Sequence, residues 1–404
     1  MVPKFYRAGT HRAVAPEETI KRAMRVAPIM GITRVANVTG LDSIGVPVVM
    51  VCRPNSRSVA VSQGKGLDLA AAKASGLMEA IEGYHAETIA LPLRYLSLEE
   101  LGYSARVVDV SQLPTVSTSA FHPNLRLLWC EGRDLLNDES MFVPYEVVHT
   151  DYTWPQPAGS GCFASSSNGL ASGNHLLEAV SHGICEIVER DATSLWKFRH
   201  PAEQDSRSVD LATIDDPACG AVLGKFHRAG LEIVVWDTTT DIGIASFFCV
   251  IFRSTEDPAR RLPPAAGAGC HPSRSIALLR ALTEAAQTRL TQISGSRDDA
   301  GRDTYAPHRY DATFDRVRHQ LALAKTRRFE EAPSWESDTI DADVEWELGR
   351  LREAGVKRVV AIDLTKDMFK LPVVRMVIPG LEAQHEVPGY TPGSRARALM
   401  SAQA

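Results

Sequence analysis

One stretch, residues 174–199, constrains the fold of this chain more than any other part of it. Its apolar residues recur at helical spacing, which predicts a single long helix over Asn174–Arg199. Glu178, Glu186 and Glu189 interleave with these apolar residues. At about 100° per residue, Glu186 and Glu189 project about 80° and about 20° away from Glu178. All three carboxylates can therefore converge on one side of the helix.

Two polar residues flank this row of acids. Asn174 is expected one turn before Glu178, and Arg190 directly follows Glu189. A row of carboxylates that ends in a cation is suited to holding magnesium ions and the phosphates bound to them. The Gly/Ser-rich residues 153–174 lead into the helix, and their small side chains allow a ligand to approach the backbone closely.

A second acidic pair lies on an Ala-rich run that favours a helix. Ser75, Glu79 and Glu82 project within about 60° of one another on this helix. The surrounding residues are small and apolar, and buried carboxylates are costly unless they are paired or bind a metal. Gly64-Lys65-Gly66, just before the helix, is expected to form a tight turn. The full GxxxxGK[ST] spacing is missing, so the chain has no P-loop here.

A third helix is predicted over residues 273–294, with Ser273 as its cap. Arg280, Glu284 and Gln287 share one face of it at i, i+4 and i+7. A solvent-exposed salt-bridge face explains this spacing as well as a ligand-binding face does. The residues alone leave both interpretations open.

Composition narrows the class of protein. The chain has 404 residues with 44% hydrophobic content, which is enough to bury a substantial core. Its net charge of −5 and the lack of a basic block argue against general nucleic-acid binding. The seven cysteines form no CxxC pair, which is typical of a reducing compartment. No apolar run is long enough for a signal peptide or membrane span, so we expect a cytoplasmic protein without membrane partners.

The order of the elements predicts an α+β fold with mixed or antiparallel sheets and the acids on long helices. We expect one large domain over residues 1–404, with a core at about 20–385 and a tail at 386–404. A short helix opens at Pro16, and Arg12 lies in the loop before it. Further helices are expected at about 309–325 and 341–354. Strands are expected in residues 34–62, 125–148, 231–253, 356–365 and 371–382.

Five segments together resemble the YcaO family across most of the chain. They are GTHR…PEET, SQGKGLDLAAAKASGLMEAIE, SNGLASGNHLLEAVSHGICEIVERDA, GAGCHPSRSIALLRALTEAAQTR and DLT…LPVVRMVIPGLE. The resemblance implies the YcaO fold and an enzyme that uses ATP to activate a backbone amide oxygen of a peptide. It also implies an ATP site without a Walker motif, in which glutamates hold magnesium, and a homodimer.

Carried over by position, the resemblance implies roles for twelve residues. Magnesium and phosphate binding would fall to Glu79, Glu82, Glu178, Glu186 and Glu189. Nucleotide contacts would come from Arg12, Thr19, Ser75, Asn174 and Arg190, and contacts near the reacting peptide from Arg280 and Gln287. Arg12 stands where some relatives use lysine, which keeps the charge but changes its geometry.

The implied chemistry suits these residue types. An amide oxygen is a poor leaving group, and phosphorylation after a nucleophile has added turns it into a good one. Phosphoryl transfer needs mainly positioning and charge neutralisation, which metal-bound glutamates and arginines supply. The N-terminal motifs are similar to YcaO proteins that act with a TfuA partner and install a thioamide from an external sulfide donor. The expected substrate is a ribosomal peptide or a protein.

Three alternatives remain. Azoline formation on Cys, Ser or Thr is one, although relatives of that type end in PxPxP and this chain shows only Pro388 and Pro392 near its end. A non-catalytic peptide-binding scaffold is the second. The third is a di-iron carboxylate protein, suggested by Glu178 and His182 one turn apart. It needs two Glu-x-x-His pairs, and the relevant helices do not carry two.

Overall fold

Three antiparallel sheets form the framework of the protein. The computed structural model describes residues 1–253, 262–297, 311–323, 325, 327–383, 385 and 388–403. One sheet contains β1 (Arg34–Asn37), β2 (Val48–Cys52) and β3 (Val61–Lys65), and a second contains β8 (Glu232–Asp237), β9 (Ser246–Phe252) and β10 (Ala265–Cys270). The third has the order β4 (Leu93–Leu96), β5 (Leu127–Asp134), β11 (Val360–Asp363), β12 (Val373–Val377) and β7 (Leu170–Ser172), with β6 (Glu139–Pro144) paired to β5.

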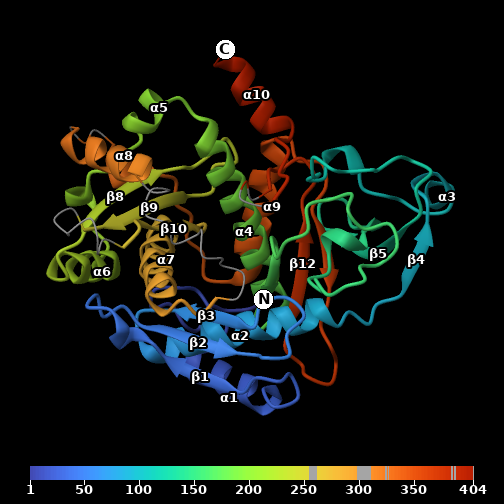
Figure 1. Ribbon diagram of the computed structural model, residues 1–404, viewed down its shortest axis with the longest axis horizontal. Helices are drawn as coiled ribbons and strands as arrows, with labels where there is room; N and C mark the ends of the chain where they lie inside the picture. Colours follow the sequence, from blue (N-terminus) through green and yellow to red (C-terminus); the bar gives the residue numbers. More distant parts are fainter. Residues whose placement is uncertain are drawn as a thin grey trace.

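The helices surround these sheets and separate them. They are α1 (Pro16–Val26), α2 (Leu69–Glu87), α3 (Leu98–Gly102), α4 (Leu176–Phe198), α5 (Pro201–Ser206), α6 (Pro217–Arg228), α7 (Arg274–Ser294), α8 (Asp311–Ala322), α9 (Ile340–Glu353) and α10 (Ser394–Ala402). Figure 1 shows the three sheets arranged around α4, which runs through the middle of the molecule. The α+β prediction is confirmed, with antiparallel pairs within each sheet.

The central position of α4 follows from its apolar stripe. Val180, Ile184 and Ile187 are buried in one cluster with Val344 of α9 and Met376 of β12. Burying each such side chain contributes about 1.5–3 kcal/mol, so this stripe fixes the helix between α9 and the third sheet. The opposite stripe, which carries the glutamates, is left facing the interior between the sheets.

The start of α4 differs slightly from the sequence prediction. The helix begins at Leu176, and His175 is its cap, with Nδ1 accepting a hydrogen bond from the Leu177 N–H at 3.2 Å. Asn174 therefore lies in the entry to the helix and not on its first turn. The prediction missed this because a histidine cap is not among the usual N-cap residues.

The first and second sheets are built as the same unit. Each is a three-stranded meander preceded by a helix (α1 or α6) and followed by a long one (α2 or α7). In each, a glycine of the last strand touches the long helix. A Cβ on Gly64 would lie 2.1 Å from the Ala72 carbonyl oxygen, and one on Gly269 would lie 2.1 Å from the Ala277 carbonyl oxygen. In both units the contacted alanine follows the glycine by eight positions, so the strand and the helix pack in the same register.

This packing corrects the prediction of a turn at Gly64-Lys65-Gly66. Gly64 and Lys65 belong to β3, and neither Gly64 nor Gly66 has a positive φ. Gly64 is needed because the backbone of α2 comes too close for any side chain, not because the chain reverses there. Lys65 belongs to a strand and not to a loop, so the prediction that the chain has no P-loop here stands.

We expect Gly64→Ala to destabilise the protein by about 1–3 kcal/mol or more, because the added methyl group meets the backbone of α2 and the helix must move. Gly349→Ala in α9 is the matched control. Nothing lies within 4 Å of its Cβ position, so alanine should stabilise the helix by about 0.5–1 kcal/mol. Urea unfolding of both variants checks this, and equal stabilities would contradict the close-packing argument.

The other predicted elements agree with the structure within a few residues. The helix expected at about 309–325 is α8, although residues 309, 310 and 324 lie outside the described part. Ser273 precedes α7 as expected, but its side chain makes no capping hydrogen bond. The tail at 386–404 contains α10, which packs against α4. Among the described residues, no helix is long and apolar enough to cross a membrane.

Candidate functional site

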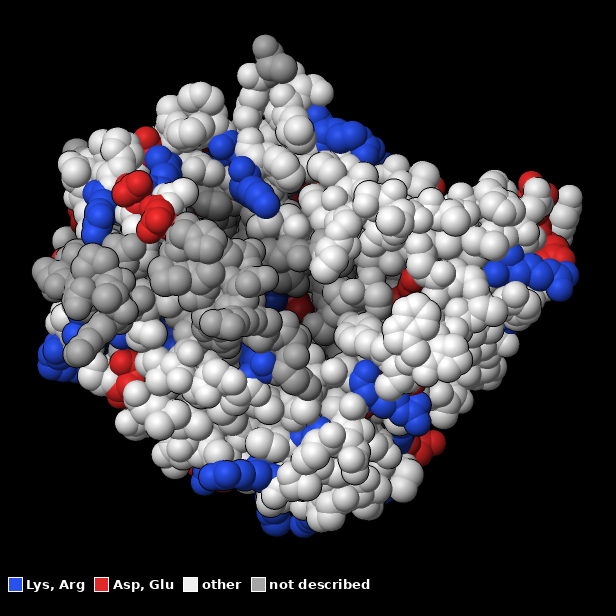
Figure 2. All heavy atoms as spheres, viewed as in Figure 1, with Lys and Arg blue, Asp and Glu red and all other residues white. Residues whose placement is uncertain are grey.

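A cavity of about 920 Å³ lies between α2, α4, α7 and the strands beside them. Ligand sites usually occupy about 300–1,000 Å³, so it is large enough for a substantial ligand. Figure 2 shows the molecular surface hollowed at the centre, with acidic and basic atoms inside. All twelve residues predicted from the sequence line this cavity, namely Arg12, Thr19, Ser75, Glu79, Glu82, Asn174, Glu178, Glu186, Glu189, Arg190, Arg280 and Gln287.

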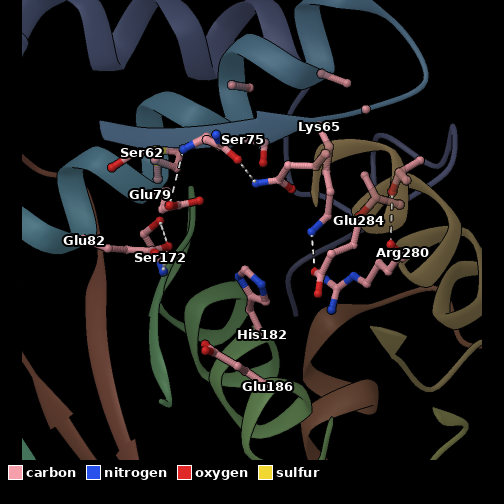
Figure 3. Close-up of a pocket in the computed structure, with 18 of the residues that line it drawn as sticks. Ser62, Lys65, Ser75, Glu79, Glu82, Ser172, His182, Glu186, Arg280 and Glu284 are labelled. Atoms are coloured by element: carbon pink, nitrogen blue, oxygen red, sulfur yellow. Dashed lines mark hydrogen bonds and ion pairs between the residues drawn. The ribbon is translucent and has the colours of Figure 1, made fainter. Parts of the chain in front are cut away.

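The α2 wall presents Glu79 and Glu82, as Figure 3 shows. The Gln63 N–H donates to Glu79 Oε1 at 3.3 Å. The N–H and hydroxyl of Ser172 donate to Glu82 Oε1 at 2.8 and 2.6 Å. Burial nevertheless raises the pKa of Glu82 to about 8. The surrounding side chains therefore supply too little positive charge to ionise Glu82 fully at neutral pH, and a metal ion could supply that charge.

The α4 wall presents Glu186, Glu189 and Arg190. Burial raises the pKa of Glu186 to about 7, against the opposing influence of Arg190. Burial also raises the pKa of Glu189, whose Oε1 lies 3.6 Å from Arg190 Nη1. The protein's own side chains therefore supply too little positive charge to keep both glutamates fully ionised.

A third wall is formed where the N-terminal segment meets the start of α4. The Ala13 N–H donates to Glu178 Oε2 at 2.9 Å, and Arg12 Nε lies 3.6 Å from Glu178 Oε1. Asn174 Nδ2 donates to the Thr19 hydroxyl at 2.9 Å. Residues separated by more than 150 positions are thereby fixed against one another, and Glu178 is oriented by the backbone beside Arg12.

The α7 wall contains the two remaining predicted residues. Arg280 Nη1 donates to the Cys270 carbonyl at 3.0 Å, and Gln287 Nε2 donates to Gln63 Oε1 at 3.4 Å. The cavity face of α7 also carries Glu284, so this side of the helix is not a solvent-exposed salt-bridge face. His182 of α4 points into the cavity between these walls (Figure 3).

Sequence reasoning missed the ion pair between Lys65 and Glu284. Lys65 Nζ lies 2.6 Å from Glu284 Oε2, and both residues line the cavity (Figure 3). Although burial opposes ionisation, Lys65 and Arg190 hold the pKa of Glu284 below its ordinary value. The pair joins β3 of the first unit to α7 of the second.

The duplicated unit contains the signal that could have identified Glu284. Glu79 follows Gly64 by the same number of positions as Glu284 follows Gly269. The backbone contacts match as well, because the N–H of the residue before each glycine donates to the glutamate at 3.3 Å, from Gln63 to Glu79 and from Ala268 to Glu284. The two glutamates therefore occupy equivalent places in the two units.

Comparison with known proteins connects this cavity to a family. A family model described as YcaO cyclodehydratase, binding ATP and Mg²⁺, matches residues 63–382. The chain belongs to the YcaO family. The match includes the α2, α4 and α7 walls of the cavity, and it confirms the resemblance seen in the sequence.

Two curated relatives support the assignment. A protein of Rhizobium leguminosarum bv. trifolii encoded in the 3′ region of tfuA is 36% identical over 375 residues, which cover 92% of this chain and 88% of the relative. A protein of Methanothermobacter thermautotrophicus is 36% identical over 386 residues, which cover 92% of this chain and 95% of the relative.

Solved structures show the same fold. YcaO from Methanopyrus kandleri, bound with AMPPCP and Mg²⁺, matches with a TM-score of 0.75 at 22% identity and covers 97% of this chain and 99% of its own. A heterocyclase in complex with substrate and cofactor matches with a TM-score of 0.78 at 24% identity. It covers 95% of this chain, which spans 54% of the heterocyclase chain.

The predicted cofactors, ATP and Mg²⁺, are those of the YcaO family. The residues of the cavity fit these cofactors. Burial disfavours ionisation of Glu82, Glu186 and Glu189, and a bound cation would favour it. Among the described residues, no three His, Cys, Asp or Glu side chains are grouped closely enough to hold a metal ion by themselves. Mg²⁺ is commonly held by one or two carboxylates together with phosphates and water, so glutamates on separate walls fit a metal–nucleotide complex.

Proposed function

We propose that this YcaO protein replaces the oxygen of a peptide backbone amide with sulfur at the expense of ATP. The observation that carries the proposal is the cavity in which glutamates from α2 and α4 face cations from the N-terminal segment, β3 and α7. The tfuA-region relative favours a thioamide as the product, because it covers nearly the whole chain at 36% identity. The proposal includes a TfuA-like partner, an external sulfide donor and a homodimeric enzyme.

Each wall has a separate task in this proposal. Glu79, Glu82, Glu178, Glu186 and Glu189 hold Mg²⁺ and, through it, the phosphates. The nucleotide is contacted by Arg12, Thr19, Ser75, Asn174 and Arg190. When bound, ATP with Mg²⁺ supplies the phosphoryl group that turns the amide oxygen into a leaving group.

The α7 wall is assigned to the reacting peptide. Arg280 and Gln287 orient the amide, since their positions on α7 face the glutamates across the cavity. Lys65 stabilises the negative charge that develops on the reacting groups beside Glu284. The backbone N–H of Ser172 and of Ala13 orient Glu82 and Glu178, so less reorganisation is needed when metal and phosphate bind.

An azoline-forming cyclodehydratase is the second candidate. The family description names that activity, and a heterocyclase has the same fold. It uses the same cavity, and differs only in that a Cys, Ser or Thr of the substrate supplies the nucleophile. The described residues 388–403 do not line the cavity, and α10 among them packs against α4.

Mass spectrometry of a modified peptide separates the two reactions. We expect a short peptide encoded beside the gene, incubated with the protein, a TfuA-like partner, ATP, Mg²⁺ and sulfide, to gain the mass difference between sulfur and oxygen. Loss of one water without a gain of sulfur would establish the azoline alternative instead. If the protein does not bind Mg²⁺ with AMPPCP, it is a scaffold and the proposal fails.

A further inference from the structure

A buried arginine beside the cavity lacks the partners that a structural arginine normally has. Arg375 of β12 is 3% exposed, and its Nη2 donates to the Ser166 carbonyl at 2.7 Å. Its Nε and Nη1 groups have no hydrogen-bond partner, and no described carboxylate forms a salt bridge with it. Burial lowers the pKa of Arg375 to about 10, so it remains a cation at neutral pH. A buried cation with two unused N–H groups is costly unless a ligand supplies the missing charge.

Other buried arginines show what full satisfaction looks like in this fold. Arg53 is 5% exposed and donates to the carbonyls of Met30 and Ala80, both at 3.2 Å, and to Glu87 at 2.6 Å. Arg289 is 4% exposed, and its Nε donates to Asp42 at 2.9 Å. Arg375 thus differs from them in charge compensation and not in burial.

Unpartnered polar groups also occur in segments beside the strand that carries Arg375, and they include both donors and an acceptor. His149 Nδ1 accepts a hydrogen bond from the Asp151 N–H at 3.2 Å, so in the neutral ring the proton is on Nε2, which has no partner. Burial, with a further contribution from Arg375, lowers the pKa of His149 and keeps the ring neutral. The hydroxyl of Thr150 and the Oδ1 of Asn168 are also unpartnered. We refer to His149, Thr150, Asn168 and Arg375 as the Arg375 cluster.

The Arg375 cluster borders the cavity. Thr150 lines the cavity, as does Ser167, which follows the residue that accepts the Arg375 hydrogen bond. Leu170, the strand partner of Arg375 in β7, also lines it. Glu186 of the α4 wall is close enough for its charge to influence Arg375. Arg375 and His149 therefore lie behind residues that line this end of the cavity, and Thr150 itself faces it.

We propose that the Arg375 cluster is an oxyanion subsite of the cavity, which takes one phosphate or carboxylate group. Two unused guanidinium N–H groups, an imidazole N–H and a hydroxyl are matched by an acceptor with several lone pairs and a negative charge. The three sources of such a group are a nucleotide phosphate, free phosphate and a carboxylate of the substrate. This subsite goes beyond the proposed function, because it requires neither thioamide formation nor ATP hydrolysis.

Calorimetric titration of the full chain with three probes tests the subsite. The probes are AMPPCP with Mg²⁺, and then inorganic phosphate and acetate added to the protein already saturated with AMPPCP and Mg²⁺. We expect Arg375→Met to weaken one of the three by about ten- to a hundredfold, as for the loss of a charge-assisted hydrogen bond. The probe that is affected identifies the source of the oxyanion.

Arg289→Met is the matched control, because it also removes a buried arginine, but one that is paired and does not line the cavity. It should leave all three affinities unchanged and lower the unfolding temperature, whereas ligand-free Arg375→Met should unfold no earlier than the wild type. Thr150→Val provides a second test in case Arg375→Met does not fold. It should weaken the binding of the same probe by about three- to tenfold. Wild-type affinities in both Arg375→Met and Thr150→Val, or no binding of any probe to the wild type, would overturn the subsite.

Discussion

Glu189→Gln and Glu82→Gln are each expected to abolish ATP turnover while the protein remains folded. Replacing one carboxylate of a metal site lowers its charge, and we expect ATP hydrolysis to fall by about two orders of magnitude or more. The fold should survive because burial raises the pKa of both glutamates, so a neutral amide costs little in the ligand-free state. Steady-state ATP hydrolysis and thermal unfolding of each variant provide the measurements.

Glu347→Gln is the matched control for these variants. Glu347 of α9 is also fully buried with a pKa raised well above its usual value by burial, and it does not line the cavity. Its Oε1 accepts hydrogen bonds from Ser181 and Cys185, which an amide oxygen can also accept. We expect ATP hydrolysis close to that of the wild type. Full activity in either cavity variant would show that the magnesium ligands are misassigned.

The contribution of Glu82 and Glu186 to the stability of the ligand-free protein is expected to fall as the pH rises from about 5 to about 8. The pKa of Glu82 is about 8 and that of Glu186 about 7 in the folded chain, against 4.5 for a free glutamate. These two carboxyl groups therefore bind more protons in the folded state than in the unfolded state throughout this range. The stabilisation is complete below about pH 4.5 and is lost as the pH rises through the folded pKa values, with a total change of several kcal/mol.

Urea unfolding at a series of pH values measures this loss. Relative to Glu82→Gln, the wild type should lose stability as the pH rises, because the amide does not titrate. Added Mg²⁺ and AMPPCP should oppose the loss above about pH 7, because metal ions bind the deprotonated carboxylates. A pH dependence of Glu82→Gln equal to that of the wild type would contradict the assignment of uncompensated carboxylates to the cavity.

The local pattern of the sequence determined the helices and the acids that they carry. Helical periodicity depends only on neighbouring residues, so the spacing of Glu178, Glu186 and Glu189 was enough to place them on one stripe of α4. The same holds for Glu79 and Glu82 on α2. Family resemblance then connected these helices to residues of the N-terminal segment, which periodicity alone could not do.

Contacts between distant segments decided the rest. The pairing of Lys65 with Glu284 joins strand β3 to helix α7, and no local pattern distinguishes such a pair from surface charges. The strand at Gly64 was mistaken for a turn because the requirement for glycine comes from the approaching backbone of α2. Arg375 reads as an ordinary strand residue, and only the packed structure shows that its charge is buried without a partner. The sequence by itself determined which residues share a helix face. The tertiary structure decided which charges are compensated, because compensation depends on neighbours that only folding brings together.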